Sequence, residues 1–150
     1  MSTTTADETV FKGSCFCGAL TYTVKGKPIL SAYCHCTLCQ RLAASPCVAT
    51  IHFPATAFNW THAQPHEAAF DKYSNRFRCK SCGACTTSYN AIASKYSIWG
   101  AQLERDENGK IRNWDLIKPT AHMFYETRMM DYNDDLPKWD GYEGKSRRLS

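Results

Sequence analysis

Eight of the nine cysteines of this chain fall into three short clusters, and this clustering constrains the fold more than any other feature of the sequence. The clusters are SCFCG, with Cys15 and Cys17; CHCTLC, with Cys34, Cys36 and Cys39; and CKSCGAC, with Cys79, Cys82 and Cys85. Cysteines at such spacings are typical of metal centres, which bring distant parts of a chain together. We therefore expect a fold organised around bound metal, with Cys47 as a separate buried thiol.

The first residues favour reduced thiols over disulfides. The stretch MSTTTADETV is polar and mildly acidic, and it lacks the basic start and apolar run of a secretory signal. A chain that stays in the cytoplasm keeps its cysteines reduced, so they are available to metals. We therefore expect a cytoplasmic, metal-binding protein.

Two cysteine pairs from distant parts of the chain suit a single ion. In an extended segment the side chains at i and i+2 point to the same side, so Cys15 and Cys17 can bind together. Cys79 and Cys82 form a C-x-x-C turn that does the same, and a glycine directly after each pair permits a tight backbone turn. Four thiolates complete the tetrahedron that zinc prefers, so we assign these cysteines to a structural zinc. The alternative is that some of them are buried thiols without metal.

The middle cluster supplies three ligands for a second zinc: Cys34, Cys36 and Cys39. Three protein ligands with a fourth position open to substrate are typical of a catalytic zinc, whereas four are typical of a structural one. Cys85 is the candidate for a fourth protein ligand, and spacing alone leaves both arrangements standing. The sequence thus predicts two zinc ions per chain, with a catalytic role for the second.

Short segments with strand patterns dominate the rest of the chain. They are residues 20–24, 29–34, 46–53, 68–73, 86–92, 97–103 and 122–127. Residues 37–43 favour a short helix, and residues 104–110 a charged turn around Gly109. The pattern predicts an all-β or β-dominated fold in a single domain, with loose termini at 1–10 and 143–150.

Composition narrows the range of partners. The formal net charge is +4, and 43% of the residues are hydrophobic. This net charge is compatible with binding a small anionic molecule. It is lower than the strongly positive net charge of a dedicated nucleic-acid-binding protein. Because no apolar run is long enough to cross a bilayer, we expect no membrane contact. The oligomeric state stays open, with a homodimer as one outcome.

The order of the three clusters resembles that of the glutathione-dependent formaldehyde-activating enzyme family, which also contains the centromere protein V homologues. The similar stretches are GSCFCGALTYTV, YCHCTLCQRLAASP and FRCKSCGA, with a looser match in HMFYETRMMDYNDDLPKWDGY. The resemblance covers residues 11–142 and implies a single β-tent domain of antiparallel sheets organised around zinc. Cys85 departs from the family pattern, in which that position is small or apolar.

The resemblance also implies an activity. The family's enzyme joins formaldehyde to glutathione to give S-hydroxymethylglutathione, and it is classed as a carbon–sulfur lyase for the reverse reaction. The family places a structural zinc on the two pairs and a second zinc on the three-cysteine cluster, as the spacing does. The expected partners are therefore a small-molecule thiol and an aldehyde, with glutathione as co-substrate.

The ligand set of the second zinc agrees with sulfur chemistry. Three thiolates leave the ion with a net negative charge, so it polarises a carbonyl weakly but leaves a bound thiolate electron-rich. We expect a thiolate to attack the aldehyde carbon, or the reverse cleavage. The alternative is a binding module in which both zinc ions are structural and a basic face contacts a macromolecule.

The two carboxylates of glutathione need cationic partners. In RFRCK, alternation places Arg76, Arg78 and Lys80 on one strand face. Arg41 follows Cys39 by two residues and is nearer the open ligand position. The resemblance adds His122, with a proton-transfer or structural role. We take Arg41 and His122 as the candidate substrate-binding residues.

Overall fold

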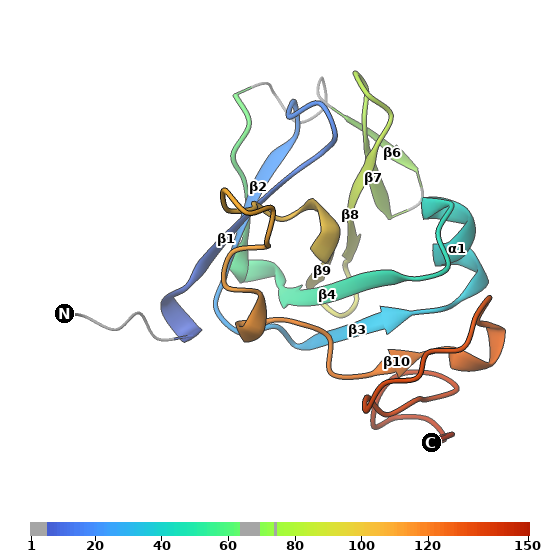
Figure 1. The fold of residues 1–150 in the computed structure, drawn as a ribbon. Coiled ribbons are helices and arrows are strands. Elements are labelled where there is room, and N and C mark those ends of the chain that lie inside the picture. The colour runs from blue at the N-terminus through green and yellow to red at the C-terminus, as the bar shows by residue number, and fades with distance from the viewer. Residues whose placement is uncertain (1–5, 64–69, 74) are drawn as a thin grey trace.

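Two β-sheets build the protein, as the computed structural model shows for residues 6–63, 70–73 and 75–150 (Figure 1). The smaller sheet has the order β1-β2-β5, from Val10–Ser14, Thr21–Lys25 and Phe58–Trp60. The larger has the order β10-β3-β4-β9-β8-β7-β6. Its strands in chain order are β3 (Leu30–Cys34), β4 (Val48–Pro54), β6 (Phe70–Tyr73), β7 (Arg76–Cys79), β8 (Cys85–Asn90), β9 (Lys95–Trp99) and β10 (His122–Met123). The prediction of a β-dominated fold is confirmed.

The helical elements are short. The α-helix α1 spans Thr37–Ala43, as the sequence predicts. The 3-10 turns are η1 (Ala6–Glu8), η2 (Ala55–Ala57), η3 (Gly100–Gln102), η4 (Trp114–Leu116) and η5 (Tyr125–Thr127). Among the described residues, no helix is both long and apolar enough to span a membrane.

The main core lies where the two sheets face each other. Alternate residues of β2, Tyr22 and Val24, are fully buried, and Ile51 of β4 and Ile98 of β9 meet them from the larger sheet. This alternation is the two-residue period of a strand with one face in the core. The core therefore fixes the larger sheet, whose β3, β7 and β8 carry most of the clustered cysteines at or near their ends.

Several strand boundaries differ from the prediction. The segment 97–103 is a strand only to Trp99, after which η3 begins, and 122–127 is a strand only to Met123. Phe124 ends β10 because its φ of 52° is a left-handed conformation that no strand can contain. The strand β10 also pairs in parallel with β3, whereas antiparallel sheets were expected. Residues 68 and 69 of the predicted strand 68–73 lie outside the described residues.

The segment 143–150, expected to be loose, has hydrogen-bonded backbone groups. The Leu149 N–H donates to the Lys138 carbonyl at 2.7 Å, and the Lys138 N–H donates to the Ser150 carbonyl at 3.0 Å. At the other end, Val10 already belongs to β1, and residues 1–5 lie outside the described part. The C-terminal segment folds back beside β10 (Figure 1), because its backbone groups find partners there.

Candidate metal centres and the adjoining pocket

The two cysteine pairs predicted to bind one ion do come together. The sulfurs of Cys15 and Cys17 are 3.7 Å apart, and those of Cys17 and Cys79 are 3.8 Å apart. With Cys82 they form a group whose four sulfurs lie within 4.8 Å of one another. Zinc–sulfur bonds of about 2.3 Å in a tetrahedron place the sulfurs about 3.8 Å apart. The four cysteines therefore fit a zinc ion.

Two similar backbone turns hold these sulfurs. The Cys15 N–H donates to the Leu20 carbonyl, and the Cys79 N–H donates to the Ala84 carbonyl, at 3.1 and 2.9 Å. Gly18 and Gly83 have φ values of 83° and 79°, in the left-handed region that a residue with a Cβ rarely adopts. The glycines after each pair thus serve the predicted purpose. The group joins the end of β1 to the β7–β8 hairpin, as a structural centre would.

The second group contains three cysteines. Cys34 ends β3, Cys36 is the N-cap of α1, and Cys39 lies in the first turn of α1. The Cys36 sulfur accepts a hydrogen bond from the Cys39 N–H at 3.3 Å. The three sulfurs lie within 4.8 Å of one another, and within the described residues no histidine or carboxylate joins them.

The second group is preorganised for a cation. Hydrogen bonds from the thiols of Cys34 and Cys39, with backbone amides, lower the pKa of Cys36 to about 2. The hydrogen bonds that the Cys34 thiol makes with Cys36 and Cys39 raise the pKa of Cys34. Several sulfurs compete to carry negative charge in one small volume, which is the environment that a thiophilic cation relieves. The three cysteines therefore fit a zinc ion that takes one further ligand.

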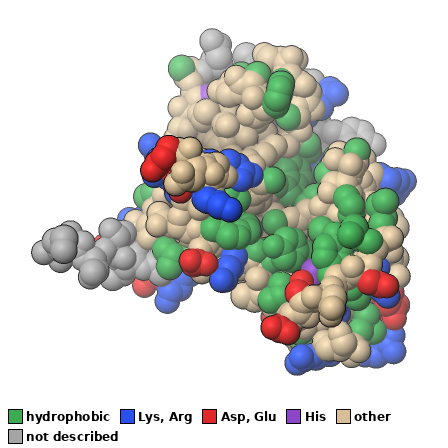
Figure 2. All heavy atoms as spheres, viewed as in Figure 1, with side chains coloured by type: hydrophobic (Ala, Val, Ile, Leu, Met, Phe, Trp, Pro, Cys, Tyr) green, Lys and Arg blue, Asp and Glu red, His purple; other side chains and the backbone are tan. Residues whose placement is uncertain are grey.

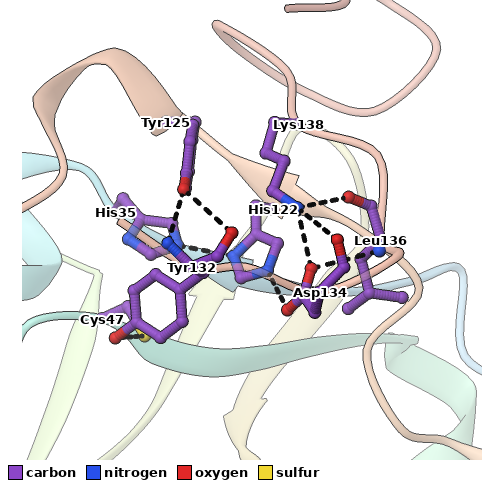
Figure 3. A network of polar contacts seen from close by, with 8 residues as sticks. All are labelled: His35, Cys47, His122, Tyr125, Tyr132, Asp134, Leu136 and Lys138. Carbon is purple, nitrogen blue, oxygen red and sulfur yellow. Dashed lines mark hydrogen bonds and ion pairs between the residues drawn. The ribbon is translucent and has the colours of Figure 1, made fainter. Parts of the chain in front are cut away.

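His35 lies between two of these cysteines but points away from them. Its Nε2 is 2.8 Å from His122 Nδ1, and His122 Nε2 is 2.8 Å from Asp134 Oδ2 (Figure 3). Lys138 donates to the other Asp134 oxygen at 2.8 Å. Burial raises the pKa of Asp134, but the hydrogen bonds with Lys138 and His122 outweigh this effect and hold the pKa at about 2. Asp134 thus stays ionised and accepts from His122, which in turn accepts from His35.

This chain of contacts fixes the backbone between the second group's ligands. The His35 carbonyl accepts from Gln40 Nε2 at 2.8 Å and from Thr127 Oγ1 at 2.9 Å, and its N–H donates to the Met123 carbonyl at 3.0 Å. Burial, and then the neighbouring His122, lower the pKa of His35 to about 4, so its ring is neutral at pH 7. His122 is itself fully buried, so its ring is not exposed to solvent.

We predict that His122→Asn lowers the free energy of unfolding by about 2 to 4 kcal/mol, because His35 and Asp134 would lose buried hydrogen-bond partners. Chemical denaturation of the zinc-loaded protein measures this. Asp134→Asn keeps the shape and a hydrogen-bonding group, so its effect should be smaller. Wild-type stability of His122→Asn would contradict the supporting role of the network.

A pocket of about 890 Å³ lies beside α1 and the C-x-x-C turn. Leu42 and Ala43 of α1 form part of its wall, and Gly83 and Ala84 of the C-x-x-C turn form another part. Residues three and four apart share one face of a helix, so Cys39 lies on the same face of α1 as Leu42 and Ala43. In the space-filling view, hydrophobic side chains gather in a hollow beside α1 (Figure 2). None of the three cysteines of the second group lines the pocket. Val48 does line it, and Val48 packs against the same core cluster as Cys36 and Cys39, so the pocket lies near the second group.

The predicted cations divide between the pocket and the outer surface. Arg76 and Arg78 line the pocket. Arg76 also acts electrostatically on the thiols of Cys39 and Cys85. Arg41 is exposed, donates to the Thr37 carbonyl of its own helix at 3.1 Å, and does not line the pocket.

Cys85 belongs to neither group of sulfurs within the described residues. It lines the pocket, and its carbonyl accepts a hydrogen bond from Gln102 Nε2 at 2.9 Å. Burial raises the pKa of the Cys85 thiol.

We predict that Cys85→Ala leaves both zinc ions and the activity in place, since its sulfur stands outside both clusters. The measurement is the zinc content per chain, together with zinc-edge X-ray absorption. Loss of a sulfur neighbour in the variant would mean that Cys85 is the fourth ligand of the second zinc.

Sequence reasoning missed two contacts around this site. Cys47 lines the pocket, and its sulfur is 3.5 Å from the Tyr132 hydroxyl (Figure 3). The Tyr132 ring packs against His35 and His122, with centroids 5.1 Å from each. No spacing in the sequence connects residue 47 with residue 132, because only the fold brings them together.

Comparison with known proteins agrees with the cysteine geometry. The sequence model of the glutathione-dependent formaldehyde-activating enzyme family matches residues 10–127. No curated protein matches this chain. A solved crystal structure of a Rhodobacter sphaeroides protein is 21% identical, with a TM-score of 0.46, over 67% of this chain and 96% of the other. That similarity is too low to bear on function.

Proposed function

This chain belongs to the glutathione-dependent formaldehyde-activating enzyme family, and we propose that it is a carbon–sulfur lyase acting on a glutathione–aldehyde adduct. The observation that carries the proposal is a group of three cysteines beside a pocket that two arginines line. Four cysteines would form a closed site, whereas three leave room for a substrate thiol.

Cys34, Cys36 and Cys39 would hold the second zinc, and the four cysteines of the first group would hold the structural one. When bound, a zinc ion holds a coordinating thiol in its thiolate form at neutral pH. The protein's own contribution is to fix the three sulfurs. Cys36 is the N-cap of α1, and the hydrogen bond that its sulfur accepts from the Cys39 N–H holds it in place. The contact of His35 with His122 positions the backbone between Cys34 and Cys36.

Arg76 and Arg78 would bind the carboxylates of glutathione. Guanidinium groups form paired, charge-assisted hydrogen bonds with carboxylates, which orient the ligand as well as attract it. Arg76 is the better candidate, because its charge already reaches Cys39. It would place the substrate thiol toward the second group and leave the reacting carbon facing the pocket.

We predict that Arg76→Ala raises the KM for glutathione about tenfold and changes kcat little. The variant would lose a cation that binds a glutathione carboxylate, but it would keep the cysteines of the reaction centre. Steady-state kinetics at low and high salt measure this, and salt should reduce the difference by screening. Arg41→Ala is the matched control, since Arg41 is exposed and away from the pocket. An equal effect of the two variants would contradict the assignment.

The direct test of the function is exchange between free and glutathione-bound formaldehyde. Carbon-13 exchange spectroscopy on labelled formaldehyde and glutathione measures both directions of the reaction at equilibrium. The zinc-loaded protein should accelerate the exchange in proportion to its concentration. No acceleration at any concentration would overturn the proposed reaction.

The proposed chemistry needs reduced thiols at seven ligand positions. A reducing compartment keeps them in that state, so we propose the cytoplasm as the location. The partners proposed are small molecules, and the formal charge of +4 gives no reason to invoke nucleic acid.

A further inference from the structure

The pocket beside the second cysteine group is larger and more apolar than formaldehyde requires. Its volume of about 890 Å³ lies in the range of sites that enclose an organic ligand of many atoms. A one-carbon aldehyde would leave nearly all of it unused. The pocket must therefore be explained by another part of the ligand.

The lining of the pocket divides into a cationic part and an apolar part. Arg76 and Arg78 come from β7, whereas Leu42, Val48 and Trp99 come from α1, β4 and β9. None of these three apolar side chains is fully buried, so a ligand can cover them. Covering apolar surface stabilises a complex by about 25 cal/mol for each Å² removed from water.

The peptide part of glutathione suits the apolar part poorly. Ser45 already donates to the Cys47 carbonyl at 2.7 Å, and the Gln102 amide nitrogen donates to the Cys85 carbonyl at 2.9 Å. Of these two side chains, the Gln102 Oε1 is buried without a hydrogen-bond partner among the described residues and remains as an acceptor. One such acceptor is too few for the two amides of a tripeptide, and a polar group buried without a partner is costly. The apolar part suits a hydrocarbon substituent.

The position of Cys39 connects the two parts. Cys39 shares a face of α1 with Leu42 and Ala43, which line the pocket. A ligand whose sulfur lies at the second group and whose carboxylates lie at the arginines can extend its sulfur substituent along this face. The substituent then covers the apolar wall.

Resting on the proposed function, we infer that the preferred substrates are glutathione adducts whose sulfur carries an apolar substituent of several carbons. Such adducts form from longer-chain or aromatic aldehydes and not from formaldehyde. The carbon–sulfur bond that forms or breaks is the same as in the proposed reaction: the thiol adds to the aldehyde carbonyl, and the carbonyl oxygen gains the thiol proton. No oxidant or further reactant is needed.

Calorimetric titration of the zinc-loaded protein with S-methyl-, S-butyl- and S-hexylglutathione tests this inference. These thioethers are stable, so binding is measured without turnover. We expect the dissociation constant to fall about three- to fourfold for each methylene that the pocket covers. Affinity that is independent of chain length would overturn the inference.

Two variants locate the effect. Ala101→Trp and Ala43→Phe each add bulk at an exposed residue that lines the pocket, so neither should disturb the core. Each should remove most of the chain-length dependence, whereas Ala93→Trp, exposed and outside the pocket lining, should keep it. Full chain-length dependence in both pocket variants would overturn the assignment to this pocket.

Formaldehyde exchange on the same samples separates this inference from the proposed function. Accelerated exchange with no chain-length dependence would keep the proposed reaction and overturn the inference. Chain-length dependence without accelerated exchange would overturn the proposed reaction and support the pocket as a site for apolar glutathione conjugates.

Discussion

Cys79→Ser is expected to leave the protein unfolded at room temperature. Cys79 belongs to the four-sulfur group that joins the end of β1 to the β7–β8 hairpin, and it is almost fully buried. Structural zinc contributes about 10 to 16 kcal/mol of apparent binding free energy, and this is folding free energy when the unfolded chain holds no site. A domain of ordinary stability has about 5 to 15 kcal/mol in total. Losing one ligand therefore removes enough to unfold it.

Circular dichroism and the zinc content per chain measure this outcome. Cys47→Ser is the matched control, because Cys47 stands outside both sulfur groups and should keep two zinc ions and a cooperative unfolding transition. A folded Cys79→Ser protein with full zinc would show that the first group is not a structural metal site.

Cys39→Ser should have the second largest effect. We expect it to reduce activity and to leave folding intact. It is expected to lower the exchange of glutathione-bound formaldehyde by more than about a hundredfold, because the zinc proposed to hold the substrate thiol would lose a ligand. The fold should persist, since Cys39 is only partly buried at the edge of the small core cluster around Cys34 and lies outside the cores around Tyr22 and around Cys15.

Exchange spectroscopy and thermal unfolding on the same sample separate the two effects. Cys85→Ala serves as the control, because it removes a pocket thiol without touching either sulfur group. Unchanged exchange in Cys39→Ser would show that the three-cysteine group is not the reaction centre.

The sequence is most informative where local chemistry decides the structure. The spacing of Cys15, Cys17, Cys79 and Cys82 predicts their convergence, since few other arrangements use two such pairs with a glycine after each. The helix at residues 37–43 is predicted at both ends, and the structure adds the reason that Cys36 caps it. Strand periodicity locates most of the larger sheet, because one face of each strand lies in a core.

Features that depend on the packing of distant segments are not predictable in this way. Nothing local shows that β10 joins the edge of β3 in parallel, or that Asp134 reaches His122. Alternation does place Arg76 and Arg78 together on one face, but only the fold shows that a pocket lies there. Arg41 follows Cys39 by two residues in the sequence, yet it is exposed and donates to a backbone carbonyl of its own helix, away from the pocket lining.

The rival interpretation, a zinc-stabilised module that contacts a macromolecule, makes a different prediction for the same residues. It requires a closed second centre and a basic face. Two of the cations assigned to such a face, Arg76 and Arg78, instead line a pocket of ligand size. This arrangement favours a small molecule, and it makes the coordination of the second zinc the decisive question.

Zinc-edge X-ray absorption, before and after addition of glutathione, tests the central claim most directly. The claim is that Cys34, Cys36 and Cys39 hold a zinc whose fourth position receives a substrate thiol. It predicts that glutathione increases the average number of sulfur neighbours per zinc, and that Cys39→Ser lowers this number in the protein without glutathione. Four sulfur neighbours at every zinc before glutathione is added, unchanged afterwards, would contradict it.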